Sequence, residues 1–455
     1  MANRAIKKVA VLGSGVMGSG IALHFAGIGC EVLLMDIVPF DLKEEEKNNP
    51  KARNRIVTDM FNAALKSKPA QAYSAEVTKR VTLGNFDDDM PKIKDCDWII
   101  EVVVERLDIK QSVYQRVEKF RKPGTLITSN TSGIPIHLLE EGLSEDFQKN
   151  FCGTHFFNPP RYLRLLEIIP TPRTSPEVVD FLMHYGDKFL GKETVLCKDT
   201  PAFIANRVGV YAMAKVFQLT AELGLTIEEV DALTGPAIGR PKTGTFKLSD
   251  LVGNDTGTKV MMGIKENCPN DEQAGAFAVP NYVQFLLDNK FFGNKSKKGY
   301  YYKDDKRNSF SLRLDTLQYE PTGKPKFASL DAAKKAESLK EKVNAFIKAD
   351  DKGAQLVKRS LAGLFAYVSN RVPEISDVLY AIDDALRAGF AWEVGPFQYW
   401  DMVGVQKGID LAEADGLKVA DWVKEMLAAG NTSFYKVENG VQQYYDQQSK
   451  TYKAI

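Results

Sequence analysis

This sequence of 455 residues has few cysteines and histidines and almost no net charge. The five cysteines are scattered, with no C-x-x-C pair and no histidine at ligand spacing, which argues against a structural metal and for a reducing compartment. Lys and Arg number 60 against 59 Asp and Glu, so the net charge of +1 gives no field that favours nucleic acid or an anionic membrane. We therefore expect a cytoplasmic protein with no metal and no nucleic-acid partner.

The sequence near the N-terminus also lacks the unbroken apolar run that a signal peptide or membrane helix needs. VAVLGSGVMGSGIALHF, residues 9–25, follows Arg4, Lys7 and Lys8 and so has one feature of a signal peptide. Its glycines and His24 make a poor membrane or signal helix, and we expect no membrane insertion. With 44% hydrophobic and 26% charged residues, the chain has the composition of a globular protein, long enough for about three domains.

Residues 6–35 instead have the pattern of a dinucleotide-binding unit. Residues 6–12 (IKKVAVL) predict a strand, residues 13–18 read GSGVMG, and residues 18–26 predict a helix. A second predicted strand, residues 30–35, follows. G-x-G-x-x-G is a weak signal alone, but its position between a strand and a helix makes it a strong one.

Each glycine of this turn has a physical role. Gly13 permits the tight turn, Gly15 lets a pyrophosphate approach the backbone, and Gly18 lets helix and strand pack closely. Val16 and Met17 lie in the turn between Gly15 and Gly18, ahead of the predicted helix, whose exposed amides and positive dipole end hold phosphate. The turn therefore predicts a cofactor site that includes all five residues.

Asp36 closes the second predicted strand, 23 residues after Gly13. An acid about 20 residues beyond the first glycine reaches the 2′-hydroxyl of the adenosine ribose. The next residues, Ile-Val-Pro at 37–39, carry no cation to offset a 2′-phosphate, so NAD is favoured over NADP. The alternative is that Asp36 is only a turn residue at the strand end.

Further along, the chain alternates between strands and helices. Residues 97–104 (DWIIEVVV) predict a buried parallel strand, residues 108–120 a helix, and residues 125–129 another strand. That strand ends in the polar loop 130–133 (NTSG), at the sheet edge where ligands bind in open α/β folds. Residues 50–69 predict an amphipathic helix whose basic residues are either solvated or in contact with a phosphorylated substrate carrier.

His155 and Glu167 form the candidate catalytic pair. His155 ends one predicted strand, Glu167 falls 12 residues later on the next, and a hairpin centred near residue 161 would put them side by side. The carboxylate would fix the imidazole tautomer, leaving the other ring nitrogen to take a proton as a general base. The remaining histidines, His24, His137 and His184, are expected to be structural.

The periodicity changes to helical after residues 198–200. We expect a nucleotide-binding domain at 1–198, a helical domain at 199–303, a linker at 304–350 and a second helical domain at 351–455. The two helical domains are related by a faint repeat, in which GTFKLSDLVG (residues 244–253) recurs as GPFQYWDMVG (residues 395–404). In the second copy Val357 stands where the first has Asn206, so we expect that copy to be structural.

These motifs together resemble the L-3-hydroxyacyl-CoA dehydrogenases. The likeness covers about residues 5–303 and rests on GSGVMGSG, EVVVERLDIK, SNTSG, HFFNPP with LRLLEII, KDTPAFIANR, GRPKTGTFKLSDLVG and GNKSKKGYYY, in that order. The resemblance implies an α/β Rossmann-type domain followed by all-α domains. It also implies NAD-dependent oxidation of (S)-3-hydroxyacyl-CoA to 3-ketoacyl-CoA, as in fatty-acid β-oxidation.

The resemblance also implies roles for single residues. It makes His155 the catalytic base and Glu167 its partner, while Ser132 and Asn206 bind the hydroxyl or carbonyl oxygen and the thioester region of the substrate. It implies further cofactor contacts at Glu105, Lys110, Asn158 and, less directly, Lys295. One departure is Gly133, which replaces a serine common after SNTS and leaves Ser132 in place.

The second helical copy resembles the tandem arrangement of multifunctional β-oxidation proteins, in which an enoyl-CoA hydratase module is fused to the dehydrogenase. No hydratase module is visible here, so a hydratase would belong to a longer parent chain or to a separate partner. The two copies are expected to pack as the helical domains of two subunits do, giving a pseudo-dimeric monomer; a homodimer is the other option.

Two other functions remain open at this point. A β-hydroxyacid dehydrogenase joins a similar nucleotide domain to helices but relies on a catalytic lysine, and no lysine lies in a matching helix motif. A non-catalytic relative would keep the fold and the cofactor site alone. The intact set of His155, Glu167, Ser132 and Asn206 speaks against it.

Overall fold

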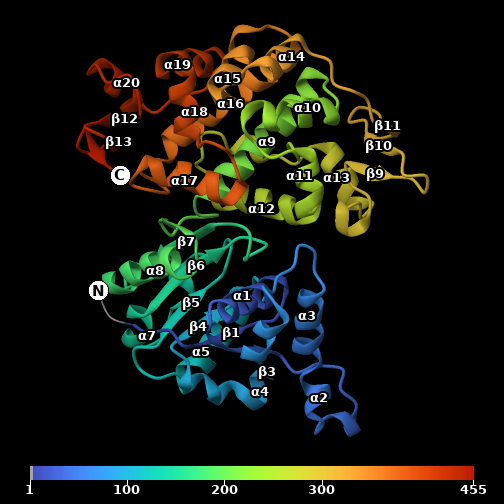
Figure 1. Ribbon diagram of the computed structural model, residues 1–455, viewed down its shortest axis with the longest axis vertical. Coiled ribbons are helices and arrows are strands. Elements are labelled where there is room, and N and C mark those ends of the chain that lie inside the picture. Colours follow the sequence, from blue (N-terminus) through green and yellow to red (C-terminus); the bar gives the residue numbers. More distant parts are fainter. Residues whose placement is uncertain (1–3) are drawn as a thin grey trace. The chain divides into compact units, whose positions relative to one another are not determined.

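The computed structural model describes residues 4–455. The chain divides into two compact units, Met1–Phe203 and Ile204–Ile455, so that the first unit ends a few residues beyond the boundary expected at 198. In Figure 1 the first unit runs from blue to green and the second from green to red. The first is an α/β unit and the second is mainly helical, as expected.

The first unit is built on one eight-stranded sheet with the strand order β3-β2-β1-β4-β5-β6-β7-β8. The strands are β1 (Lys8–Leu12), β2 (Glu31–Asp36), β3 (Val81–Asn85), β4 (Trp98–Glu101), β5 (Leu126–Ser129), β6 (Phe151–Phe156), β7 (Leu165–Pro170) and β8 (Glu193–Leu196). Neighbouring strands are parallel throughout except β6 and β7, which pair antiparallel. The order reverses between β1 and β4, and this is the switch point at which open α/β sheets bind ligands.

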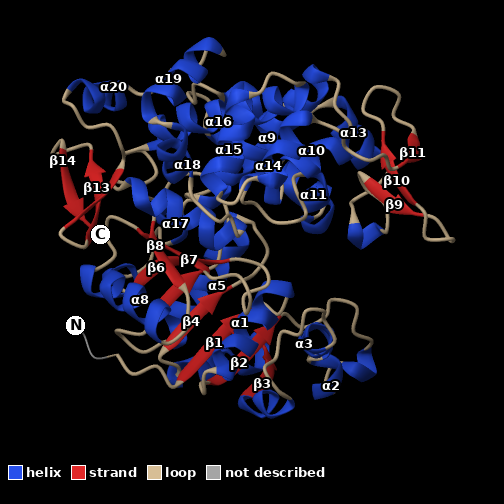
Figure 2. Cartoon of the chain, turned by 45° about the horizontal axis from the view of Figure 1, so that its top comes forward, coloured by secondary structure: helices blue, strands red, loops and turns tan. Residues whose placement is uncertain are grey.

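Helices cover both faces of this sheet, as Figure 2 shows with strands in red and helices in blue. They are α1 (Val16–Gly27), α2 (Pro50–Arg53), α3 (Arg55–Leu65), α4 (Phe86–Asp89), α5 (Leu107–Phe120), α6 (Ile136–Leu139), α7 (Glu145–Lys149) and α8 (Pro176–Lys188). Helices α1, α3 and α8 share one hydrophobic core with the sheet. On the other face, the Tyr114 ring of α5 packs edge-on against Phe147 and Phe151.

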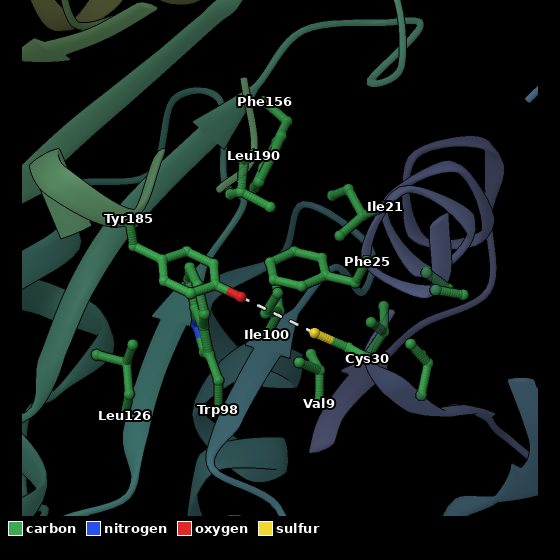
Figure 3. Packing of buried hydrophobic residues seen from close by; sticks show 14 of the residues in the cluster. Val9, Ile21, Phe25, Cys30, Trp98, Ile100, Leu126, Phe156, Tyr185 and Leu190 are labelled. Carbon is green, nitrogen blue, oxygen red and sulfur yellow. Dashed lines mark hydrogen bonds between the residues drawn. The ribbon is translucent and has the colours of Figure 1, made fainter. Parts of the chain in front are cut away.

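The central strands are apolar over most of their length because both of their faces are covered. Residues Val9, Val11, Trp98 and Ile100 are fully buried. Figure 3 shows the core on the α1 side, where the Phe25 ring meets Trp98 edge-on at 5.1 Å and Cys30 lies near the Tyr185 hydroxyl. This core fixes the sheet on which the candidate site is built.

The second unit begins with five helices and a small sheet. The elements are α9 (Ala205–Leu223), α10 (Ile227–Leu233), α11 (Phe246–Val252), α12 (Asn254–Asn267), α13 (Asn281–Asp288), β9 (Tyr301–Lys303), β10 (Ser309–Leu312) and β11 (Tyr319–Pro321). The three strands form an antiparallel meander.

The same succession follows a second time after two intervening helices, α14 (Ala328–Lys335) and α15 (Leu339–Lys348). The second set is α16 (Lys352–Arg371), α17 (Leu379–Phe390), α18 (Pro396–Val403), α19 (Val405–Ala414), α20 (Asp421–Ala428), β12 (Tyr435–Glu438), β13 (Val441–Asp446) and β14 (Thr451–Ala454). Five helices followed by an antiparallel meander in each set confirm the expected duplication.

Each copy is stabilised from within by a buried aspartate at a matching position. Asp231 accepts hydrogen bonds from the Phe246 amide and the Tyr301 hydroxyl, and Asp383 accepts the same bonds from the Phe397 amide and a tyrosine of β12. Burial raises the pKa of Asp231 to about 6 and that of Asp383 to about 8, even though these donors favour the ionised form. The duplication therefore extends from the chain path to side-chain contacts.

The expected linker at 304–350 is wrong, because the structure folds most of it. Strands β10 and β11 and helices α14 and α15 occupy this segment. Its few apolar residues are spaced so that each helix has a buried side: Leu330 and Ala333 on one helix, Val343 and Phe346 on the other. The segment was expected to be a linker because it is rich in polar residues and contains prolines, and its few apolar residues give only a weak helical pattern. Across residues 4–455, none of the helices is long and apolar enough to cross a membrane.

We expect two glycine substitutions in the second unit to act in opposite directions. A Cβ at Gly209 of α9 would lie 2.2 Å from the Phe390 ring of α17, so Gly209→Ala should destabilise the protein by about 1–3 kcal/mol. A Cβ at Gly263 of α12 would meet no atom within 4 Å, so Gly263→Ala should stabilise it by about 0.5–1 kcal/mol. Urea unfolding midpoints measure both effects, and a stabilised Gly209→Ala variant would contradict the packing of α9 against α17.

Candidate active site

The glycine turn between β1 and α1 has the geometry that its sequence predicts. Gly13 has φ +107°, and a Cβ there would lie 2.5 Å from the Val102 carbonyl oxygen. A Cβ at Gly18 would lie 1.8 Å from the Gly13 carbonyl oxygen, so helix and turn approach too closely for any side chain. A Cβ at Gly15 would meet nothing within 4 Å, which leaves open space beside the first turn of α1. These residues, with the exposed Val16 and half-buried Met17, fit a bound pyrophosphate.

Asp36 lies at the carboxyl end of β2 and is tied to this turn. Its Oδ2 accepts hydrogen bonds from the Ser14 amide at 2.6 Å and the Ser14 hydroxyl at 2.5 Å. Its Oδ1 accepts the amide of Ile37 at 2.8 Å. The carboxyl group therefore accepts all three of these hydrogen bonds and sits next to the phosphate turn, where a nucleoside ribose is expected to follow.

His155 and Glu167 meet as the sequence predicts. They are opposite one another in the antiparallel register of β6 and β7, and His155 Nδ1 lies 2.7 Å from Glu167 Oε2. Both side chains are buried, with 5% and 0% of their surface exposed. Because a carboxylate can only accept, the imidazole carries its proton on Nδ1 and leaves Nε2 as a proton acceptor.

Ser132 completes this group from the loop after β5. Its hydroxyl oxygen lies 3.1 Å from His155 Nε2, so the hydroxyl donates to the free imidazole nitrogen. The adjoining Asn130 fastens the loop to β6, because its side-chain oxygen accepts the Phe156 amide at 2.9 Å. The three side chains that the sequence assigned to catalysis in this unit are therefore in contact.

Glu105 follows β4 and holds the same loop. Its Oε1 accepts hydrogen bonds from the Thr131 hydroxyl at 2.5 Å, the Ser132 amide at 2.9 Å and the Gly133 amide at 3.1 Å. Burial raises the pKa of the Glu105 carboxyl, but attraction to Lys110 and these hydrogen bonds outweigh it, and the pKa lies below its ordinary value. Glu105 is thus an anion at the sheet edge beside Ser132.

Lys110 lies beneath the loop that Glu105 holds. Its side chain is only 1% exposed, and Nζ lies 2.7 Å from Glu101 Oε1 and 3.3 Å from Glu105 Oε2. The ammonium group is enclosed beneath the loop because α5 starts directly behind the end of β4. Spacing along the sequence could not show that the side chain points inward.

Two phenylalanine rings enclose the imidazole. The centroid of Phe157 lies 4.6 Å from that of His155, and that of Phe203 lies 5.6 Å away. Phe203 and its neighbour Ala202 have φ +52° and +63°, left-handed conformations that cost non-glycine residues about 1–2 kcal/mol each. The sequence analysis missed both rings, since Phe203 reaches His155 only through this unusual backbone path.

The turn between β6 and β7 carries Asn158, which is exposed at its start. Lys192 is bound to this turn. Its ammonium group donates hydrogen bonds to the carbonyl oxygens of Pro160 and, at 2.7 Å, of Leu163. Burial lowers the pKa of Lys192 to about 8. The sequence analysis did not identify Lys192, which lies about thirty residues from the turn and carries no motif.

Asn206 and Lys295 belong to the second unit and are described within it. Asn206 is half buried in the first turn of α9, beside the fully buried Arg207. Lys295 Nζ lies 2.5 Å from Asp255 Oδ1 at the start of α12, with 48% of its side chain exposed.

The other histidines have structural roles. His24 is buried on α1 and lies 3.0 Å from the Leu190 carbonyl oxygen, and burial together with Lys192 lowers its pKa to about 4. His137 pairs with Asp199 at 2.6 Å at the start of α6, and His184 is exposed on α8. Within residues 4–455, no cluster of three or more His, Cys, Asp or Glu side chains could hold a metal ion.

A cavity of about 1060 Å³ in the first unit lies elsewhere. Its lining includes Lys7, Glu31 and Tyr185, so it opens where β1 and β2 begin. The phosphate turn and Asp36 lie where these strands end. The candidate site therefore lies at the carboxyl ends of the strands, away from this cavity.

Comparison with known proteins finds relatives that match along the chain. Residues 8–200 match the family model for the NAD binding domain of 3-hydroxyacyl-CoA dehydrogenase, and residues 203–303 match the model for its C-terminal domain. A probable 3-hydroxyacyl-CoA dehydrogenase of Bacillus subtilis is 43% identical over 459 residues, covering 100% of this chain and 58% of that protein. The chain thus spans little more than half of that relative.

Two further likenesses bear on the extent of the match. A probable 3-hydroxyacyl-CoA dehydrogenase of Deinococcus radiodurans is 43% identical over 298 residues, covering 66% of this chain and 83% of that protein. The crystal structure of a 3-hydroxybutyryl-CoA dehydrogenase from Escherichia coli K12 has a TM-score of 0.67 and covers 94% of this chain and 99% of that one. At 22% identity, that likeness shows a shared fold that includes the second helical copy.

Gly15→Ala should separate cofactor binding from folding. Since a Cβ at Gly15 meets no protein atom within 4 Å, we expect the variant to keep the melting temperature of the wild type. The same Cβ would fill the space for the pyrophosphate, so the affinity for NADH should fall by roughly tenfold or more. Fluorescence titration with NADH measures this loss, and unchanged affinity would mean that the phosphates do not lie on this turn.

Proposed function

The chain belongs to the 3-hydroxyacyl-CoA dehydrogenase family, and from this premise we propose that it oxidises (S)-3-hydroxyacyl-CoA to 3-ketoacyl-CoA with NAD. The observation that carries the proposal is the buried contact of His155 with Glu167, which leaves Nε2 free as a base beside the Ser132 hydroxyl. Fatty-acid β-oxidation contains such a reaction. The relatives named above support the same substrate class.

NAD is the cofactor of this fold, and its pyrophosphate would be held by the turn at Gly13, Gly15 and Gly18. Asp36 would accept a hydrogen bond from the adenosine ribose, and the absence of a cation at residues 37–39 disfavours a 2′-phosphate. Glu105 and Asn158 would contact the cofactor from the sheet edge, and Lys295 from the second unit. When bound, NAD accepts the hydride that leaves C3 of the substrate.

His155 would take the proton of the C3 hydroxyl on Nε2. The C3–H bond breaks with hydride transfer, the O–H bond breaks with proton transfer to the imidazole, and the C3–O bond becomes a carbonyl. The imidazolium that forms would be stabilised by the Glu167 carboxyl group, which is buried and in direct contact with it. A hydrogen bond to a charged group of this kind contributes about 1.5–3 kcal/mol.

Ser132 and Asn206 would orient the substrate oxygens. The Ser132 hydroxyl already lies on Nε2, so a substrate hydroxyl that binds there would share or replace this hydrogen bond. Phe157 and Phe203 exclude water from one side of the imidazole. A dry site strengthens the electrostatic contacts made to the developing carbonyl.

Because the chain carries two packed helical copies, we propose that it is a monomer with an internal pseudo-dimer. Helix α9 of the first copy packs along α16 of the second, with the Tyr211 and Tyr367 rings stacked at 3.8 Å. An enoyl-CoA hydratase would then act as a separate module or partner that supplies the 3-hydroxyacyl-CoA.

We expect His155→Ala to lose activity by about 10²–10⁴-fold, the usual worth of a general base. The assay follows the loss of NADH absorbance with acetoacetyl-CoA. NADH binding should be retained, because His155 does not line the phosphate turn, and His184→Ala, an exposed histidine of α8, is the matched control with full activity. Equal rates for wild type and His155→Ala would remove His155 from the mechanism, and an inactive wild type would contradict the substrate class.

The proposed assembly predicts one chain per particle. Size-exclusion chromatography with light scattering should give the mass of a single chain at micromolar concentration, because the face of α9 that would pair with another subunit is covered by α16 of the same chain. A concentration-independent dimer would contradict the internal pseudo-dimer.

A further inference from the structure

The turn between β6 and β7 binds the segment that follows α3. The Arg161 guanidinium donates hydrogen bonds to the carbonyl oxygens of Ala70 at 2.8 Å and Ala72 at 2.9 Å. The Tyr162 hydroxyl donates to the Ala70 carbonyl oxygen at 2.9 Å. The guanidinium also lies over the Tyr73 ring, 4.2 Å from its centre. We call this group of contacts the Arg161 clasp.

The clasped segment is held from its other side by α1. Gln71 is buried, and a Cβ at Gly27 of α1 would lie 2.4 Å from the Tyr73 ring. A Cβ at Gly20, one face further along α1, would lie 3.0 Å from the Pro160 ring of the turn. The segment is therefore enclosed between α1 and the turn of the hairpin that carries His155.

Helices α2 and α3 depend on this segment for their position. We call residues 50–69 the arm. None of the residues of α2 is buried, and α3 buries only Val57 and Phe61, which pack near the β3 edge of the sheet (Figure 1). An arm with so few buried side chains is held mainly at its two ends.

The start of the arm is tied down by its two arginines. Arg53 pairs with Asp88 at 2.7 Å, and Arg55 pairs with Asp41 at 2.5 Å. The other end of the arm runs directly into the segment that the Arg161 clasp holds. The clasp is therefore the second of two fixed points.

The lysines of the arm have no such internal partners. Lys51, Lys66 and Lys68 are exposed, and within residues 4–455 no carboxylate forms an ion pair with any of them. Asp59 is the only acidic residue of the arm. Three cations are thus available to an anion, and two of them, Lys66 and Lys68, lie just ahead of the clasped segment.

We propose that the Arg161 clasp holds the arm ready for the phosphate groups of a CoA thioester, which makes Arg161 a positioning residue that determines specificity for the carrier. The proposal rests on the proposed function, in which the substrate is an acyl-CoA. A loose arm must be ordered when its ligand binds, and this ordering lowers the affinity. With the clasp in place, the arm is ordered before binding.

The test compares two substrates that differ only in the carrier. Acetoacetyl-CoA carries the phosphorylated nucleotide, whereas acetoacetyl-pantetheine has the same reacting group and no phosphate. In Arg161→Met, kcat/KM for acetoacetyl-CoA should fall by roughly five- to twentyfold through KM, because the arm must now be ordered on binding. For acetoacetyl-pantetheine, kcat/KM should stay within about twofold of wild type, since the variant removes only binding of the carrier.

The ratio of the two kcat/KM values is the decisive readout, because it does not depend on how much active protein survives the substitution. Arg161→Lys should restore part of the ratio, since an ammonium group still donates to a carbonyl oxygen but lacks the planar face over Tyr73. Tyr162→Phe removes a single hydrogen bond of the clasp and serves where Arg161→Met does not fold. It should lower the ratio in the same direction and by less.

A double-mutant cycle tests whether the clasp acts through the arm. Lys66→Gln/Lys68→Gln should itself lower the ratio. Arg161→Met should then lower it little further, because the cations that the clasp positions are gone. Independent, multiplying losses would mean that Arg161 acts by another route and would overturn the proposal.

Arg164→Met is the matched control. Arg164 belongs to the same turn, but its side chain is 69% exposed and pairs with Glu193 at 2.9 Å rather than with the arm. It should leave the ratio unchanged. An equal fall in Arg164→Met would show that any cation near the turn attracts the substrate through charge alone, and the clasp would have no special role.

Two further results would overturn the proposal and leave the proposed function intact. One is an equal loss for both substrates in Arg161→Met, which would place the effect on the hairpin itself. The other is an unchanged KM for acetoacetyl-CoA, which would mean that the lysines of the arm are only solvated. A wild-type protein that reduces neither thioester with NADH would instead contradict the proposed function.

Discussion

The antiparallel register of β6 and β7 is the constraint on which the site depends. All other neighbouring strands of the sheet are parallel, so this hairpin is the one place where residues twelve apart in sequence become direct partners. In this register His155 and Glu167 share a face of the sheet. A slip of one residue would turn one of them to the opposite face, into the core beside α1 and α8, because side chains alternate along a strand. The Lys192 contacts to the carbonyl oxygens of the turn support this hairpin.

Burial strengthens the contact between His155 and Glu167 that this register creates. A carboxylate in contact with an imidazole in water is weakly held, whereas the same contact in a low-dielectric interior is strong and oriented. His155 and Glu167 are nearly inaccessible, and the Phe157 and Phe203 rings close one side. The tautomer follows from this geometry, since the carboxylate must receive the Nδ1 proton. In the proposed mechanism, the imidazole is therefore oriented as a base before any ligand binds.

The sequence predicted those parts of the site that local pattern determines. The glycine turn is encoded in adjacent residues, and the His155–Glu167 contact follows from two strands and one short turn. It could not predict features that depend on distant neighbours. The sequence did not show, for example, that the end of β4 and the start of α5 enclose the Lys110 side chain. Helices α14 and α15 were hidden in a polar segment because each needs only two or three buried residues to pack.

The duplication shows which features the fold itself requires. Both copies keep the buried aspartates that accept amides at a helix start, Asp231 in the first and Asp383 in the second, so these contacts belong to the fold. At the position that corresponds to Asn206, however, the second copy has Val357, which is fully buried. A polar side chain there would need a hydrogen-bonding partner, and an apolar one adds to the packing of α16 instead. The second copy has therefore kept the contacts that stabilise the helices and replaced the one proposed to serve a substrate, which fits a domain whose task is to cover α9.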